Sequence, residues 1–69
     1  MSDYEQDIEN LLFLIKKYCP PLQGERISNL IEEDFNPKFI FSELTKMKIA
    51  SIMNEKDLIL YKRILLKYI

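Results

Sequence analysis

The chain has 69 residues, of which 48% are hydrophobic and 30% are charged, and its formal net charge at pH 7 is −1. This length allows one small domain at most, and this hydrophobic content excludes an intrinsically disordered protein. A net charge so close to zero excludes a strong overall attraction to nucleic acid or to anionic lipid. We therefore expect a single domain over residues 1–69.

The cysteine content and the N-terminus indicate the compartment. The single Cys19 excludes an internal disulfide and is typical of a reducing environment. The first ten residues are acidic, unlike a secretory or mitochondrial leader. The longest apolar run, Leu11–Ile15, is too short to span a bilayer. We expect an intracellular protein of the cytoplasm or nucleus that has no membrane partner.

The first predicted helix begins near the N-terminus and ends at a proline pair. Ser2 and Glu5 have the spacing of a capping box, and Pro20-Pro21 ends the helix because the residue before a proline is disfavoured in the α region. Apolar side chains recur between these limits at helical spacing, at Tyr4, Ile8, Leu11, Leu12, Ile15 and Tyr18.

A second helix is expected to start at Pro21 or Gln23, and a third after Asn36. Asn36 followed by Pro37 is the favoured order of an N-cap and a first helical residue. Thr45 is expected to end the third helix and to cap a short helix that follows it.

The end of the chain predicts a short helix and then a longer one. The short helix is expected over Lys46–Met53. Asn54, followed by Glu55 and Asp57 in the first turn, is a strong start signal for the last helix. No strand alternation or internal repeat is visible. The predicted fold is all-α, a small single-domain bundle of four to five short helices.

The last helix has more apolar residues than one buried stripe needs. Its predicted inward face consists of Leu58, Tyr61, Ile64, Leu65, Tyr68 and Ile69. Its opposite side carries a basic stripe of Lys56, Arg63 and Lys67, flanked by Ile59, Leu60 and Leu66. On the first helix, Phe13 also lies opposite the apolar face. Exposed apolar side chains bordered by charge are typical of a binding patch.

The predicted core is drawn from the last four helices. Its main members are expected to be Leu30, Ile31, Leu44, Ile52, Leu58, Ile64 and Leu65.

The chain lacks the residues that most enzymes and metal sites use. It has no histidine, and one cysteine without histidine makes neither a Cys–His nucleophile nor a zinc site. Gly24 alone cannot form a phosphate-binding loop. The acidic run Glu32, Glu33 and Asp34 is more typical of a solvated helix end than of a cation site. We expect no enzyme activity, cofactor or metal.

Charge is divided between the two halves of the chain. Residues 1–34 contain eight acids and three bases, a net charge of −5, whereas residues 35–69 contain three acids and seven bases, a net charge of +4. This division predicts an electrically two-sided molecule.

Residues 29–69 resemble a sterile alpha motif (SAM) domain. The matching segments, in order, are NLIEED, FIFSE, the Leu44-Thr45 pair, KIASIM and DLILYKRILLKYI. Met53, Asn54 and Ile59 stand where that family usually has glycines. The resemblance implies a five-helix bundle, and it implies head-to-tail association in which an acidic middle surface binds the basic last helix of the next copy.

A second, weaker resemblance concerns residues 22–31. LQGERISNLI is similar to a helix of the MLLE domain of poly(A)-binding proteins, a peptide-binding helical bundle. The segment KFIFSELTKM lacks the glycine that admits an aromatic side chain in that family.

The sequence thus predicts a non-enzymatic protein–protein interaction module, a scaffold that binds itself or another small helical domain. The expected partner-binding residues are Glu32, Glu33, Asp34, Lys56, Ile59, Leu60, Lys62, Arg63 and Phe13. Two alternatives remain open at this point. One is an RNA-binding helical domain that uses basic residues of the last helix, and the other is a small structural subunit of a larger assembly.

Overall fold

The computed structural model of the protein describes residues 3–69. Its elements are α1 (Asp3–Tyr18), α2 (Pro21–Glu33), α3 (Pro37–Lys46), the 3₁₀ turn η1 (Ile49–Ile52) and α4 (Glu55–Tyr68). Residues 3–69 contain no strand, so the predicted small all-α bundle is confirmed. The capping box predicted at Ser2 lies outside the described residues.

Local signals in the sequence set most of the helix boundaries. The side-chain oxygen of Asn36 accepts a hydrogen bond from the Phe39 amide at 3.2 Å, and Pro37 is the first residue of α3. Asn54 caps α4 in the same way, accepting from the Asp57 amide at 2.8 Å. Both predicted caps are confirmed, and α2 starts at Pro21.

The predicted role of Thr45 as a helix cap is wrong. Its hydroxyl donates a 2.7 Å hydrogen bond to the Phe41 carbonyl one turn earlier, and α3 continues to Lys46. The chain then turns at Lys48, which adopts a left-handed conformation with φ of 57°. The helix predicted over residues 46–53 is reduced to the 3₁₀ turn Ile49–Ile52.

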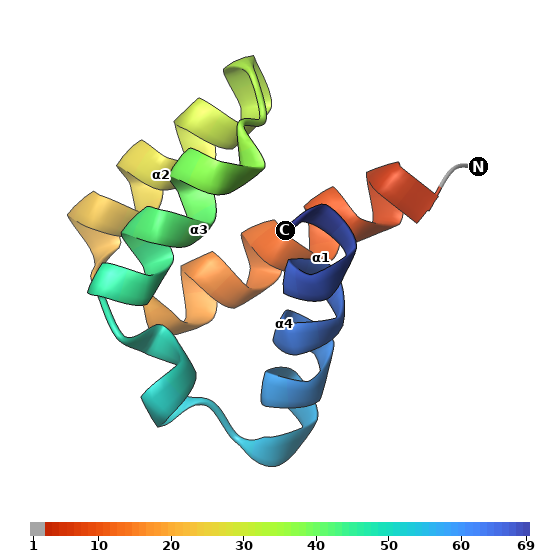
Figure 1. Cartoon of the computed structure of the whole chain (residues 1–69). Coiled ribbons are helices and arrows are strands. Elements are labelled where there is room, and N and C mark those ends of the chain that lie inside the picture. Colours follow the sequence, from red (N-terminus) through yellow and green to blue (C-terminus); the bar gives the residue numbers. More distant parts are fainter. Residues whose placement is uncertain (1–2) are drawn as a thin grey trace.

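The helix α1 is the centre of the arrangement. It packs against α2 on one side and against α4 on the other (Figure 1). Figure 1 also shows α2 and α3 side by side, and an ion pair between Arg26 and Glu43 at 3.3 Å connects them. The molecule measures 30 × 25 × 18 Å, and each of the four α-helices has both buried and exposed residues.

One continuous core fills the space between these helices. Its buried members are Leu11, Leu14, Ile15, Cys19, Ile27, Ile31, Ile40, Phe41, Leu44, Ile49, Tyr61 and Ile64. Ile31, Leu44 and Ile64 were predicted. The other predicted members Leu30, Leu58 and Leu65 are half-buried.

Three residues predicted to face inward are exposed. Tyr4, in the first turn of α1, is 49% exposed, and its ring packs at the edge of the bundle against Phe35 and Tyr68. Ile52 is 63% exposed, because η1 makes a single turn whose buried side chain is Ile49 and the chain leaves the core at Ile52. Ile69 is 66% exposed because it follows Tyr68, the last residue of α4.

A pair of substitutions on α4 tests this core. Replacing the buried Ile64 with Ala leaves a cavity and should lower the free energy of unfolding by about 2–5 kcal/mol. Replacing Leu66 with Ala should change it by less than about 0.5 kcal/mol, because this side chain is 81% exposed. Urea unfolding followed by circular dichroism measures both values, and equal costs would mean that α4 is packed differently.

Candidate interaction surface

The first turn of α4 is fixed to the end of α1 by a buried carboxylate. Asp57 accepts a hydrogen bond from Lys17 at 2.8 Å and another from the Tyr18 hydroxyl at 2.5 Å. The side-chain amide of Asn54 donates to the same oxygen at 3.2 Å. Burial of a carboxylate is unfavourable unless hydrogen-bond donors compensate for it. Lys17, Tyr18 and Asn54 provide these donors when α1 and α4 pack in the observed register.

A matching set of contacts lies at the other end of the same helix pair. Asp7 of α1 is also buried, and it accepts hydrogen bonds from Lys67 at 2.7 Å and from the Tyr68 hydroxyl at 2.9 Å. The sequence pattern had placed Lys67 on a free basic stripe with Lys56 and Arg63. That prediction is wrong for Lys67, because its ammonium group is bonded to Asp7.

The two sets of contacts, which we call the α1–α4 locks, follow one spacing rule. In each helix an aspartate precedes a Lys-Tyr pair, with ten residues to the lysine and eleven to the tyrosine. Each aspartate binds the Lys-Tyr pair of the other helix, so the helices run antiparallel. This repeated spacing is visible in the sequence and is the signal from which the locks could have been found.

The charges of the locks shift the pKa values of their members. Hydrogen bonds from Lys17 and Tyr18 lower the pKa of Asp57, and the hydrogen bond from Lys67 lowers the pKa of Asp7. Burial and the bond to Asp7 raise the pKa of Tyr68 to about 12. Its hydroxyl therefore remains a donor over the physiological pH range.

Because the locks fix the rotation of α4, they determine which of its side chains face outward. Four of these residues lie along one exposed line, which we call the α4 outer ridge: Lys56, Ile59, Arg63 and Leu66. Ile59 is 53% exposed and Leu66 is 81% exposed. Beside the ridge lies a shallow depression of about 270 Å³, lined by Lys56, Asp57, Ile59, Leu60 and Arg63. Exposed apolar side chains therefore lie beside exposed bases on this side of α4.

Two predicted members of the surface are placed differently from each other. Leu60 lines the depression, but it is half-buried and packs against the core. Phe13 of α1 is 54% exposed, and the Lys17 ammonium group lies 5.6 Å from the centre of its ring. Lys17 also binds Asp57, so Phe13 and the first turn of α4 have this lysine as a common neighbour.

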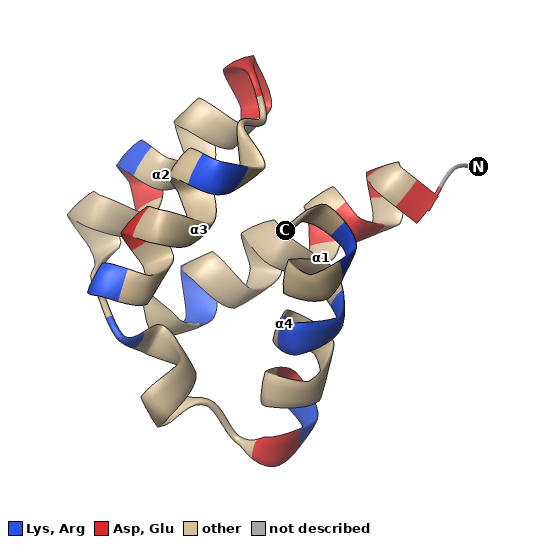
Figure 2. Cartoon of the chain, viewed as in Figure 1, with Lys and Arg blue, Asp and Glu red and all other residues tan. Residues whose placement is uncertain are grey.

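The predicted acidic residues lie at a separate corner of the molecule. Glu32 and Glu33 end α2 and Asp34 follows them, and all three are exposed. We call these three residues the acidic corner. Figure 2 shows this corner at the turn between α2 and α3, well away from the bases of α4. Lys62 is exposed as well, but it lies 100° around the helix from Arg63 and outside the ridge.

Several kinds of site are absent from the part of the chain that the structure describes. Among residues 3–69, no group of three or more His, Cys, Asp or Glu side chains is placed to hold a metal ion. None of the described helices is long and apolar enough to cross a membrane. The thiol of Cys19 is buried, and this burial raises its pKa, so it is a poor nucleophile at neutral pH.

Comparisons with protein-family models, with curated proteins and with solved structures found no match to this chain.

The lowered pKa values predict how stability depends on pH. A carboxyl group whose pKa is lower in the folded state stabilises the fold above its unfolded pKa, near 3.8, and loses this effect as the pH falls through the folded value. The melting temperature should therefore fall between about pH 5 and pH 2. In the double variant Asp7→Asn with Asp57→Asn it should be lower at pH 7 and change less with pH.

The matched control is Glu9→Gln, an exposed position on α1. Its melting curve should follow that of the wild type at every pH. A double variant with the wild-type pH profile would show that the locks do not contribute to stability in solution.

Proposed function

We propose that this chain is a non-enzymatic interaction module that associates with further copies of itself, the acidic corner of one copy binding the basic outer side of α4 on the next. The observation that carries this proposal is the α4 outer ridge, where the exposed side chains of Ile59 and Leu66 lie beside those of Lys56 and Arg63. Large apolar side chains on a surface are typical of protein contacts when charged groups surround them.

The distribution of charge supports association between unlike surfaces. The acidic corner and the bases of α4 lie at different places on one molecule, so they can bind two different neighbours (Figure 2). Contacts of this heterologous kind form chains when their rotation does not close a ring. The resemblance of residues 29–69 to SAM domains, which implies the same arrangement, adds to this argument.

Light scattering against protein concentration tests the proposal, at about 0.05 M and about 1 M salt. We expect the mass to rise with concentration at low salt and to rise less at 1 M, where the Debye length falls to about 3 Å. The variant Lys62→Glu with Arg63→Gln should be monomeric, and so should Glu32→Lys with Glu33→Lys. Gln is chosen at position 63 because Arg63 lowers the pKa of Asp7 and a new carboxylate there would disturb a lock.

Mixing the two variants provides the control. The α4 variant keeps an intact acidic corner, and the acidic-corner variant keeps the bases of α4. The mixture should therefore form a one-to-one heterodimer that cannot grow further. Circular dichroism establishes that both variants are folded. A wild type that stays monomeric at millimolar concentration would contradict the proposal, and binding of an RNA hairpin with a steep salt dependence would favour the nucleic-acid alternative instead.

A further inference from the structure

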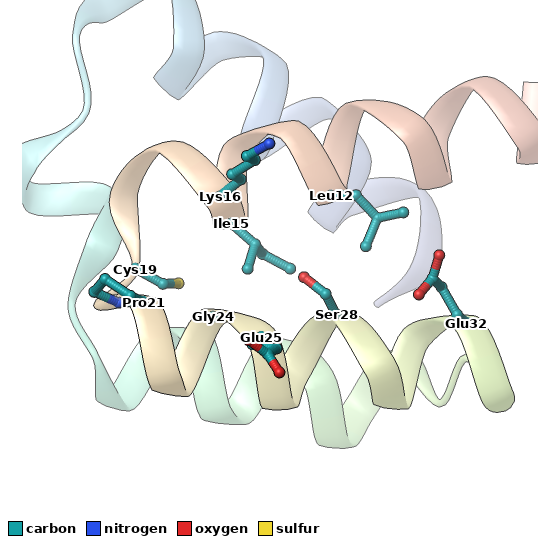
Figure 3. A pocket seen from close by; sticks show the side chains of 9 residues that line it. All are labelled: Leu12, Ile15, Lys16, Cys19, Pro21, Gly24, Glu25, Ser28 and Glu32. Carbon is teal, nitrogen blue, oxygen red and sulfur yellow. The ribbon is translucent and has the colours of Figure 1, made fainter.

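A groove lies between α1 and α2 on the surface of the described chain. Its volume is about 560 Å³, and its lining residues are Leu12, Ile15, Lys16, Cys19, Pro21, Gly24, Glu25, Ser28 and Glu32. In Figure 3 the side chains of Leu12 and Ile15 extend from α1 towards α2, and the Ser28 hydroxyl lies between the two helices. The floor of the groove is therefore mostly apolar.

Two small residues on α2, Gly24 and Ser28, determine the shape of the groove. Gly24 has no side chain, and a Cβ atom added there would lie 3.3 Å from the Cβ atom of Cys19. The absence of a side chain at Gly24 therefore allows α1 and α2 to approach closely at the Cys19 end of the groove. One turn further along α2, Ser28 is only half-buried, and Leu12 across from it on α1 is also half-buried, whereas Ile15 is 0% exposed. The groove thus has room for side chains from outside the molecule.

The two walls of the groove carry opposite charges. Glu25 and Glu32 line the α2 wall, and Glu32 also belongs to the acidic corner. Lys16 is the charged residue of the α1 wall. The two carboxylates are seven residues apart, which is about 10 Å along a helix. An occupant that fits must present apolar groups to the floor and bases to the α2 wall.

The α4 outer ridge has these properties at the same spacing. Ile59 and Leu66 are seven residues apart, so their side chains project about 10 Å from each other. Lys56 and Arg63 are also seven residues apart and lie together on one flank of this apolar pair. The other flank carries Glu55 and Lys62, one acid and one base, so the charge match of the ridge lies on the Lys56 and Arg63 side.

We infer that the α4 outer ridge of one copy docks in the α1–α2 groove of a second copy. Ile59 and Leu66 enter the groove, and Lys56 and Arg63 face Glu25 and Glu32. The occupant is a helix placed in an apolar groove, held in register by charges on its flank. This inference rests on the proposed self-association and specifies the surface that receives α4.

Disulfide trapping tests the contact directly. Two variants are prepared with Cys19→Ser as background, one with Ser28→Cys in the groove and the other with Leu66→Cys on the ridge. Mixed under oxidised glutathione, they should form a cross-linked heterodimer on a non-reducing gel. The control replaces Ser28→Cys by Ser42→Cys, an exposed position on α3, and should give no such band.

Affinity measurements separate this inference from the general proposal. Ser28→Leu fills the groove and should raise the dissociation constant for self-association at least about tenfold, whereas Ser42→Leu should leave it unchanged. Lys56→Glu should weaken association more than Lys62→Glu, and Leu66→Asp more than Ile52→Asp. The first of these two pairs compares two exposed lysines, and the second compares two exposed aliphatic side chains.

The outcomes distinguish the groove inference from the proposed self-association. If the charge variants of the acidic corner and α4 abolish association but Ser28→Leu and the trapping experiment have no effect, the groove inference is wrong and the proposed function stands. If the wild type does not associate at all, both are wrong. If Ser28→Leu weakens binding of a different protein and self-association is absent, the groove binds a partner other than a second copy.

Discussion

Two carboxylates are buried between α1 and α4, and the rest of the molecule is arranged around the need to provide them with partners. Burial of an ionised group is unfavourable unless hydrogen bonds and an opposite charge compensate for it. Asp7 and Asp57 each obtain a lysine and a tyrosine from the opposite helix. An antiparallel pairing in one register provides both sets at once, and a shift by one turn would remove both.

The need to pair Asp7 and Asp57 also determines which face of α4 is exposed. Apolar packing alone tolerates several rotations of a helix, because leucine and isoleucine side chains are interchangeable in a core at modest cost. The locks remove that freedom for α4. Once Asp57 and Lys67 point towards α1, the side of the helix with Ile59 and Leu66 is left exposed. The exposed ridge follows from the buried polar contacts, and the proposed function depends on it.

The sequence predicted those parts of the structure that have local causes. Asn36 and Asn54 cap helices through their own side chains, and the proline pair ends α1 within two residues. Local signals failed at Thr45, whose hydroxyl can bond backwards to a carbonyl as readily as forwards to an amide. The pattern of hydrophobic residues gave the helix faces but treated Ile52 as core, because a pattern does not show where the chain leaves the core.

The candidate site was predictable only in part for the same reason. The exposure of Phe13, Ile59 and Arg63 follows from their position opposite an apolar stripe, and the structure places all three outside. Whether a charged residue is free depends on its tertiary partner, and the partner of Lys67 is sixty residues away. The α1–α2 groove likewise depends on how closely two helices approach at Gly24, which single-helix patterns do not contain.

The lock between Asp7 and the Lys67-Tyr68 pair also bears on how the chain ends behave. The terminal turns of small domains usually fray, and their amide protons exchange with solvent without unfolding of the rest. Here the last turn of α4 is tied to α1 by a buried carboxylate. Opening that turn breaks the contacts of Asp7 with Lys67 and Tyr68, a cost that a free helix end does not have. We therefore expect the amide protons of the final turn of α4 to exchange more slowly than those of an untied helix end.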